Sequence, residues 1–132
     1  MAYLRFVRPK AVDGTRYREG FFCSAYELRE ELELSTTSRE QLESLLSWYR
    51  TNLPIPDRFT SSRSRGTDQR ITRGLSWFKK EASEAIQKSF ELIDLLRAHG
   101  YPIDVLRSDR VGRIVYEDEY QVVAEPFFDT PT

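Results

Sequence analysis

The sequence predicts an α+β fold, a two-layer sandwich of about three helices on one face of a small, mainly antiparallel sheet. Residues 76–100 repeat apolar side chains at helical spacing, and residues 103–125 contain short strand-like runs between turn signals. Residues 3–8 alternate like a further strand. Helices and sheet require each other, because a long apolar stripe must be buried against another apolar surface.

The length and composition indicate one domain over residues 1–132. A content of 39% hydrophobic residues is enough for a packed core. No run reaches the roughly 18 apolar residues of a membrane span, and the N-terminus lacks the order of a signal peptide. We therefore expect a cytoplasmic protein without a membrane partner. The single cysteine, Cys23, fits a reducing compartment, and we interpret it as a small buried side chain rather than a reactive thiol.

The N-terminal part predicts a strand followed by a surface excursion. Leu4 and Phe6 alternate with more polar neighbours over residues 3–8, which is the period of a strand with a buried face. Pro9 is expected to end this strand or to place it at a sheet edge. Residues 10–20 contain a turn signal at residues 12–15, so we expect them at the surface.

Two helices are predicted next, each from a capping-box spacing. Ser24 and Glu27 have the first such spacing, which predicts a short helix to about Glu33. Thr37 has the same spacing to Glu40 and precedes a leucine-rich stripe, which predicts a second helix ending near residue 52.

The longest predicted helix covers residues 76–100. Ser76 is placed as its N-cap, and Gly100 supplies the left-handed residue after its end. Pro102 then prevents continuation. The apolar stripe comprises Phe78, Ala82, Ala85, Ile86, Leu92, Ile93 and Leu96.

The C-terminal part predicts a three-stranded antiparallel meander. Its strands are expected at residues 103–106, 113–117 and 120–125, and the N-terminal strand joins them as a fourth. The last residues, 128–132, are expected to fray.

Charge is distributed unevenly, and this is the strongest functional indication in the sequence. Residues 58–80 hold seven basic side chains and one acid, Asp68, which gives plus six, whereas the rest of the chain holds 13 basic and 20 acidic side chains, which gives minus seven. Residues 58–75 read as a long basic loop, rich in serine and arginine. Arginine offers paired donors to phosphate, and an aromatic face can stack on a base. The predicted binding residues are Arg58, Arg63, Arg65, Arg70, Arg73, Trp77, Lys79 and Lys80.

Several catalytic classes find no support in the sequence. Phosphate loops, dinucleotide-binding glycine motifs, paired cysteine motifs and nucleophile elbows are absent, and the chain has one histidine. We assign no catalytic residue, no metal ligand and no cofactor.

The sequence leaves three functions open. The first is a small binding module that presents the basic loop to nucleic acid or another phosphate-bearing ligand. The second is an interaction or regulatory protein that uses its apolar helix or an open sheet edge to bind a protein partner or to form a homodimer. The basic loop would then be solvated or paired with acids of its own chain. The third is a metal-dependent phosphoesterase. Its carboxylates would come from Asp104, Asp109, Glu117, Asp118, Glu119 and Glu125.

Overall fold

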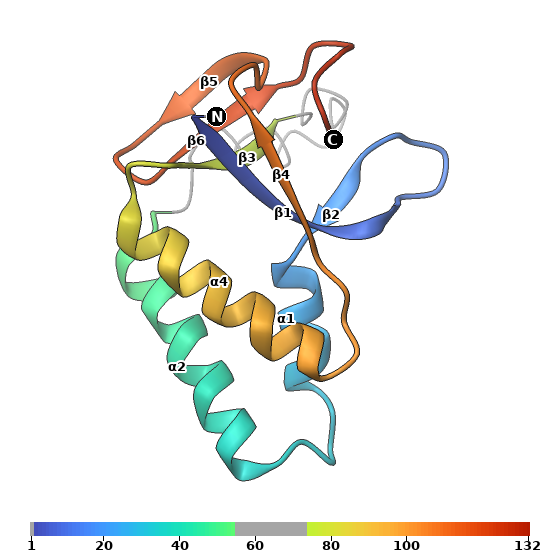
Figure 1. Ribbon diagram of the computed structural model, residues 1–132, viewed down its shortest axis with the longest axis vertical. Helices are drawn as coiled ribbons and strands as arrows, with labels where there is room; N and C mark the ends of the chain where they lie inside the picture. Colours follow the sequence, from blue (N-terminus) through green and yellow to red (C-terminus); the bar gives the residue numbers. More distant parts are fainter. Residues whose placement is uncertain (1, 55–73) are drawn as a thin grey trace, which may run out of the picture.

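A computed structural model describes residues 2–54 and 74–132 and confirms the α+β class (Figure 1). Over these residues, three helices lie on one side of a curled, six-stranded sheet that resembles half a barrel. The elements are β1 (Tyr3–Ala11), β2 (Arg18–Gly20), α1 (Phe22–Arg29), α2 (Thr36–Asn52), β3 (Leu75–Lys79), α4 (Ser83–Ala98), β4 (Asp104–Ser108), β5 (Arg113–Glu117) and β6 (Gln121–Glu125).

Strand β1 organises the sheet, because neighbouring strands cover both of its edges. Tyr3 is opposite Ser108 of β4 on one edge and opposite Lys79 of β3 on the other. Farther along, Val7 is opposite Gly20 of β2. Strand β3 pairs in turn with β6, and β6 with β5, so that every pairing in the described part is antiparallel.

The predicted meander is therefore corrected. Strands β5 and β6 form a hairpin, but β4 pairs with β1 instead of β5. The alternation of polar and apolar residues marks each strand, but it carries no information about the strand's partner.

Strand β1 also extends beyond its predicted end. It runs through Pro9 to Ala11, and its register with β2 shifts between Val7 and Ala11. An irregularity of this kind tolerates a proline, which has no N–H to donate. The predicted turn at residues 12–15 is confirmed, since the Thr15 N–H donates to the Val12 carbonyl and Gly14 has a φ of 78°.

The helix predicted over residues 76–100 is wrong at its beginning. Residues 75–79 form strand β3, and α4 begins at Ser83. Ser76 is thus a strand residue rather than an N-cap. Phe78 and Ala82 are four residues apart, which is a helical spacing, and this coincidence extended the predicted stripe toward the N-terminus. Aromatic residues such as Phe78 also favour strands. The end is as predicted, with Gly100 at a φ of 88°.

Neither predicted capping box starts its helix in the structure. Helix α1 begins at Phe22 and ends at Arg29, so Ser24 lies inside the helix and does not cap it. Helix α2 uses Ser35 as its N-cap, and the Ser35 hydroxyl accepts the Ser38 N–H at 3.2 Å. The predicted end of α2 near residue 52 is confirmed.

Two apolar clusters fill the two faces of the sheet. The first lies between the sheet and the helices, and the second lies on the opposite face around Trp77 and Val122. Trp77 and its neighbour Phe78 point into different clusters, as expected for successive strand residues. The curled sheet is thus buried on both faces at β3.

The C-terminal tail is hydrogen-bonded to the β1–β2 hairpin, where the sequence led us to expect fraying. Arg16 donates to the carbonyls of Phe127 and Phe128, and the Arg18 N–H donates to the Thr132 carbonyl. The buried Arg5 guanidinium donates to the Thr132 and Arg18 carbonyls. Burial, followed by the charge of Arg18, lowers the pKa of Arg5 to about 10.

The packing of α4 predicts a graded response to truncation. Ile93 is fully buried, so Ile93→Ala should lower the free energy of unfolding by about 2 to 5 kcal/mol. Ile86→Ala should cost less, because Ile86 is half-buried. Urea denaturation measures both. Asp94→Ala, at an exposed position of the same helix, is the control, and equal losses for Ile93→Ala and Asp94→Ala would contradict this packing.

Candidate functional site

The predicted binding residues fall into two groups in the structure. Those of the basic loop lie outside the described residues, namely Arg58, Arg63, Arg65, Arg70 and Arg73. Leu75, the last residue of the predicted loop, begins β3. Trp77 is fully buried, so its ring is not available to stack on a ligand. Lys79 pairs with Glu117, whereas Lys80 is exposed after the end of β3.

The carboxylates proposed for a phosphoesterase are engaged separately in the structure. Glu117 pairs with Lys79, Glu125 pairs with Arg113, and Asp104 lies 3.6 Å from Arg18. Asp118 accepts the backbone N–H groups of the turn that follows it, as in an ordinary hairpin turn. No cluster of three metal-ligating side chains occurs within residues 2–54 and 74–132. The described geometry therefore gives this function no support.

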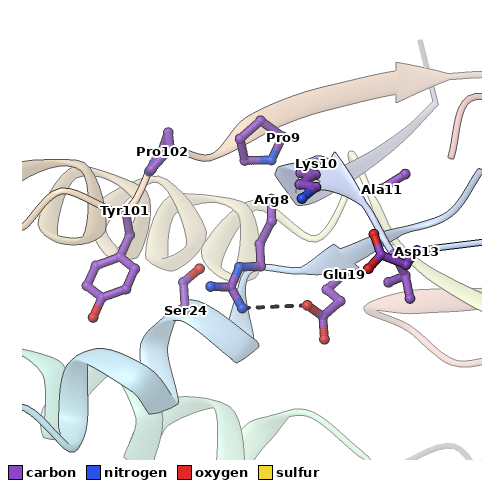
Figure 2. A pocket seen from close by; sticks show the side chains of 10 residues that line it. Arg8, Pro9, Lys10, Ala11, Asp13, Glu19, Ser24, Tyr101 and Pro102 are labelled. Atoms are coloured by element: carbon purple, nitrogen blue, oxygen red, sulfur yellow. Dashed lines mark ion pairs between the residues drawn. The ribbon is translucent and has the colours of Figure 1, made fainter.

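A different site is visible beside the β1–β2 hairpin (Figure 2). This cleft, which we call the hairpin cleft, has a volume of about 480 Å³, within the range typical of small ligand sites. One wall is the end of β1 with the following turn, and the facing wall is the α4–β4 connection. The lining residues are Arg8, Pro9, Lys10, Ala11, Val12, Asp13, Glu19, Ser24, Tyr101 and Pro102.

The cleft exists because β4 pairs with only part of β1. The last pair between the two strands is Val7 with Asp104, and before Asp104 the chain comes from Tyr101 and Pro102. Beyond Val7, β1 continues to Ala11 with only β2 beside it. The edge of β1 that faces the cleft is therefore without a paired strand in the described part of the chain.

Arg8 is the central charge of the cleft and is held by two carboxylates. Its guanidinium lies 2.6 Å from Glu27 and 3.6 Å from Glu19, both measured from nitrogen to oxygen. The hydrogen bond from Arg8 lowers the pKa of Glu27, and the same bond raises the pKa of Arg8. Both shifts indicate that Arg8 is committed to its own chain.

Cys23 is partly buried rather than buried as expected, and its thiol contacts Glu19. Its sulfur is 3.6 Å from a Glu19 oxygen, and burial together with the Glu19 charge raises the pKa of Cys23. A nucleophilic cysteine requires the opposite shift. The structure thus agrees with the interpretation of Cys23 as a non-reactive side chain.

Tyr101 and Ser24 provide the remaining polar groups. The Tyr101 hydroxyl donates to Glu31, and this bond raises the pKa of Tyr101 to about 12. Ser24 is only 1% exposed, lines the cleft, and makes no side-chain hydrogen bond within the described residues. Its hydroxyl points toward the side of the cleft where Arg8 lies (Figure 2).

None of the cleft residues was a candidate from the sequence. They come from β1, the following turn, β2, α1 and the α4–β4 connection, with no motif spacing between them. The nearest signals were Pro9 and Pro102, which mark where pairing is interrupted, but their proximity depends on the β1–β4 register.

Comparisons with protein-family models, with curated proteins and with solved structures found no match. Among the described helices, none combines the length and apolar character needed to cross a membrane.

The burial of Trp77 predicts its fluorescence. In a Trp48→Phe variant, whose only tryptophan is Trp77, emission should be blue-shifted and protected from acrylamide, because the ring is fully buried. Adding an oligonucleotide should leave this emission unchanged. A quenchable, red-shifted emission would instead return Trp77 to the candidate binding residues.

The Arg8–Glu27 ion pair predicts a pH dependence. Because the folded-state pKa of Glu27 is lowered, the pair's contribution to stability is complete above the unfolded-state pKa. It is lost as pH falls through the lower folded-state pKa. A carbon-detected NMR titration should therefore find the Glu27 midpoint below that of an ordinary glutamate, and Arg8→Gln should move it upward. An unchanged midpoint in Arg8→Gln would contradict the assignment.

Proposed function

We propose that this protein is a small binding module whose basic segment, residues 58–80, contacts nucleic acid or another phosphate-bearing ligand. The observation that carries the proposal is the separation of charge along the chain, plus six in this segment against minus seven elsewhere. Arginine side chains contact phosphates in pairs of hydrogen bonds, and such contacts do not require a deep pocket.

The described residues at the two ends of the arginine-bearing stretch support the proposal. The Pro54 carbonyl, just after α2, accepts a hydrogen bond from the Gln121 side chain of β6. Gly74, just before β3, packs so closely on Val123 that a Cβ there would approach the Val123 side chain to 2.5 Å. The two described residues that flank this stretch, Pro54 and Gly74, therefore both lie against β6. A phosphate contact made by the segment would then be connected to the sheet.

Two acidic side chains on the neighbouring strands β5 and β6 already form ion pairs. Glu117 pairs with Lys79, and Glu125 pairs with Arg113. Lys80 is exposed and has no ion pair within the described part, so it remains in the proposed binding set, whereas Trp77 and Lys79 leave it.

The negative charge of the helical layer should confine polyanion binding to the basic segment. Residues 22–52 and 83–98 carry nine acidic and five basic side chains, a net charge of minus four. A polyanion is repelled by such a surface beyond the reach of the arginines, so affinity should be modest and steeply dependent on salt.

A protein-interaction function is the second candidate, because Phe128 is 90% exposed although the backbone around it is held by Arg16. An aromatic side chain displayed in this way is typical of interaction surfaces.

Removing arginines tests the first candidate. The variant with Arg63, Arg65, Arg70 and Arg73 replaced by glutamine should lose binding to single-stranded RNA or DNA at about 50 mM salt. If all four contact phosphates, the slope of log affinity against log salt should fall by about 3. Fluorescence anisotropy measures both quantities. Thermal unfolding should change little, because arginines that serve ligand binding contribute little to folding.

A matched variant makes this test specific to the segment. Lys10, Arg50, Lys88 and Arg107 have no ion pair within the described residues, and replacing all four by glutamine changes the net charge equally. This control should keep most of the affinity. Equal binding by both variants and the wild type would overturn the proposal and favour protein interaction.

A further inference from the structure

We propose that the hairpin cleft is a second binding site, which takes a lysine or arginine side chain from an extended basic peptide. The inference goes beyond the proposed function, because it uses other residues and the opposite sign of charge. It rests on the charge balance of the cleft, on one unpaired serine hydroxyl in its wall and on an open strand edge.

The charge balance favours a cation. Two acids line the cleft, Asp13 and Glu19, and two more adjoin it through their contacts with Arg8 and Tyr101, namely Glu27 and Glu31. The bases that line the cleft are Arg8 and Lys10, so the lining residues alone are neutral, and the two adjoining acids bring the sum to minus two. Arg8 is already paired with Glu27 and Glu19, so Lys10 is the remaining cation among the residues that line the cleft.

Asp13 and Glu19 are the groups available to a ligand. Asp13 is exposed and makes no side-chain interaction within the described residues. Glu19 makes the longer of the two Arg8 contacts, at 3.6 Å, and its other oxygen accepts the Cys23 thiol at 3.6 Å, while Glu27 makes the closer Arg8 contact at 2.6 Å. A second cation beside Glu19 therefore need not displace Arg8 from Glu27.

Ser24 supplies an independent observation. The residue is only 1% exposed, and its hydroxyl has no hydrogen-bond partner among the described residues. The hydroxyl is not sealed in the interior, because Trp77 Nε1 is the one buried polar side-chain atom left unpaired in the described part of the chain. The Ser24 oxygen therefore faces the cleft and is available to a ligand. An ammonium or guanidinium group would donate to the Ser24 oxygen.

The open edge of β1 favours a peptide over a small free cation. Beyond Val7, β1 has β2 on one edge and the cleft on the other. An extended peptide can add to such an edge through backbone hydrogen bonds, while its side chains enter adjacent pockets. Pro9 has no N–H, so the added pairing must be short. The apolar faces of Pro9, Pro102 and Tyr101 would contact the aliphatic part of a long basic side chain.

The test is an NMR titration of the nitrogen-15-labelled protein at physiological salt with a capped Ala-Lys-Ala-Lys-Ala peptide. Amide shifts should concentrate at residues 8–13, Glu19, Ser24 and Tyr101. A double variant, Asp13→Asn with Glu19→Gln, should weaken binding by about tenfold or more. Glu84→Gln with Asp94→Asn changes the charge equally on α4 and should bind like the wild type.

Ser24→Ala separates a ligand role from a structural one. Because the hydroxyl has no partner in the part of the fold that the structure describes, this variant should unfold at the wild-type temperature or above it, while its affinity for the peptide falls. A lowered unfolding temperature with unchanged affinity would assign Ser24 to the fold instead.

Three results would overturn the inference. They are the absence of localised shifts with the lysine peptide, equal shifts with a matched Ala-Glu-Ala-Glu-Ala peptide, and equal weakening by the α4 control variant. The glutamate result would mean that Lys10 makes the cleft an anion site. The variant lacking Arg63, Arg65, Arg70 and Arg73 should bind the lysine peptide normally, so failure of either proposal can be recognised without the other.

Discussion

The pairing of β1 on both of its edges is the constraint on which the rest of the structure depends. Four successive residues of β1, Leu4 to Val7, are buried, which is possible only for a strand covered on both faces. The helices cover one face through Leu4 and Phe6. On the other face, the buried Arg5 guanidinium reaches backbone carbonyls of β2 and of the C-terminal tail. A buried guanidinium needs such acceptors, so Arg5 connects the first strand to the last residues of the chain.

The hairpin cleft is a consequence of the same pairing. Strand β1 is nine residues long, whereas β4 has five and leaves it at Val7. At the uncovered end of β1, Arg8 is paired with Glu27 of α1 and Glu19 of β2, whereas Lys10 makes no ion pair within the described residues. The cleft is thus the place where the sheet lacks a strand and where side chains from three elements meet.

Local patterns predicted those elements whose signals do not depend on distant partners. The end of α2, strands β5 and β6, and the left-handed Gly100 follow from short-range rules, and the structure has them. The prediction failed at residues 75–79, because Phe78 fits the helical stripe as well as it fits a strand, and only pairing with β1 and β6 decides between them. For the same reason the cleft could not be predicted, since it depends on the register that places Tyr101 near Arg8.

The charges of this protein can be interpreted only together with the ion pairs that they form. The net charge of minus one conceals a basic segment of plus six, and counting charges finds that segment without a structure. Counting could not identify the cleft, where the cation Arg8 is neutralised by its neighbours while Asp13 has no partner among the described residues. Fields from exposed charges decay over about 8 to 10 Å at physiological salt, so each surface acts through its own local balance. The proposed anion-binding segment and the proposed cation-binding cleft are therefore compatible within one small, nearly neutral chain.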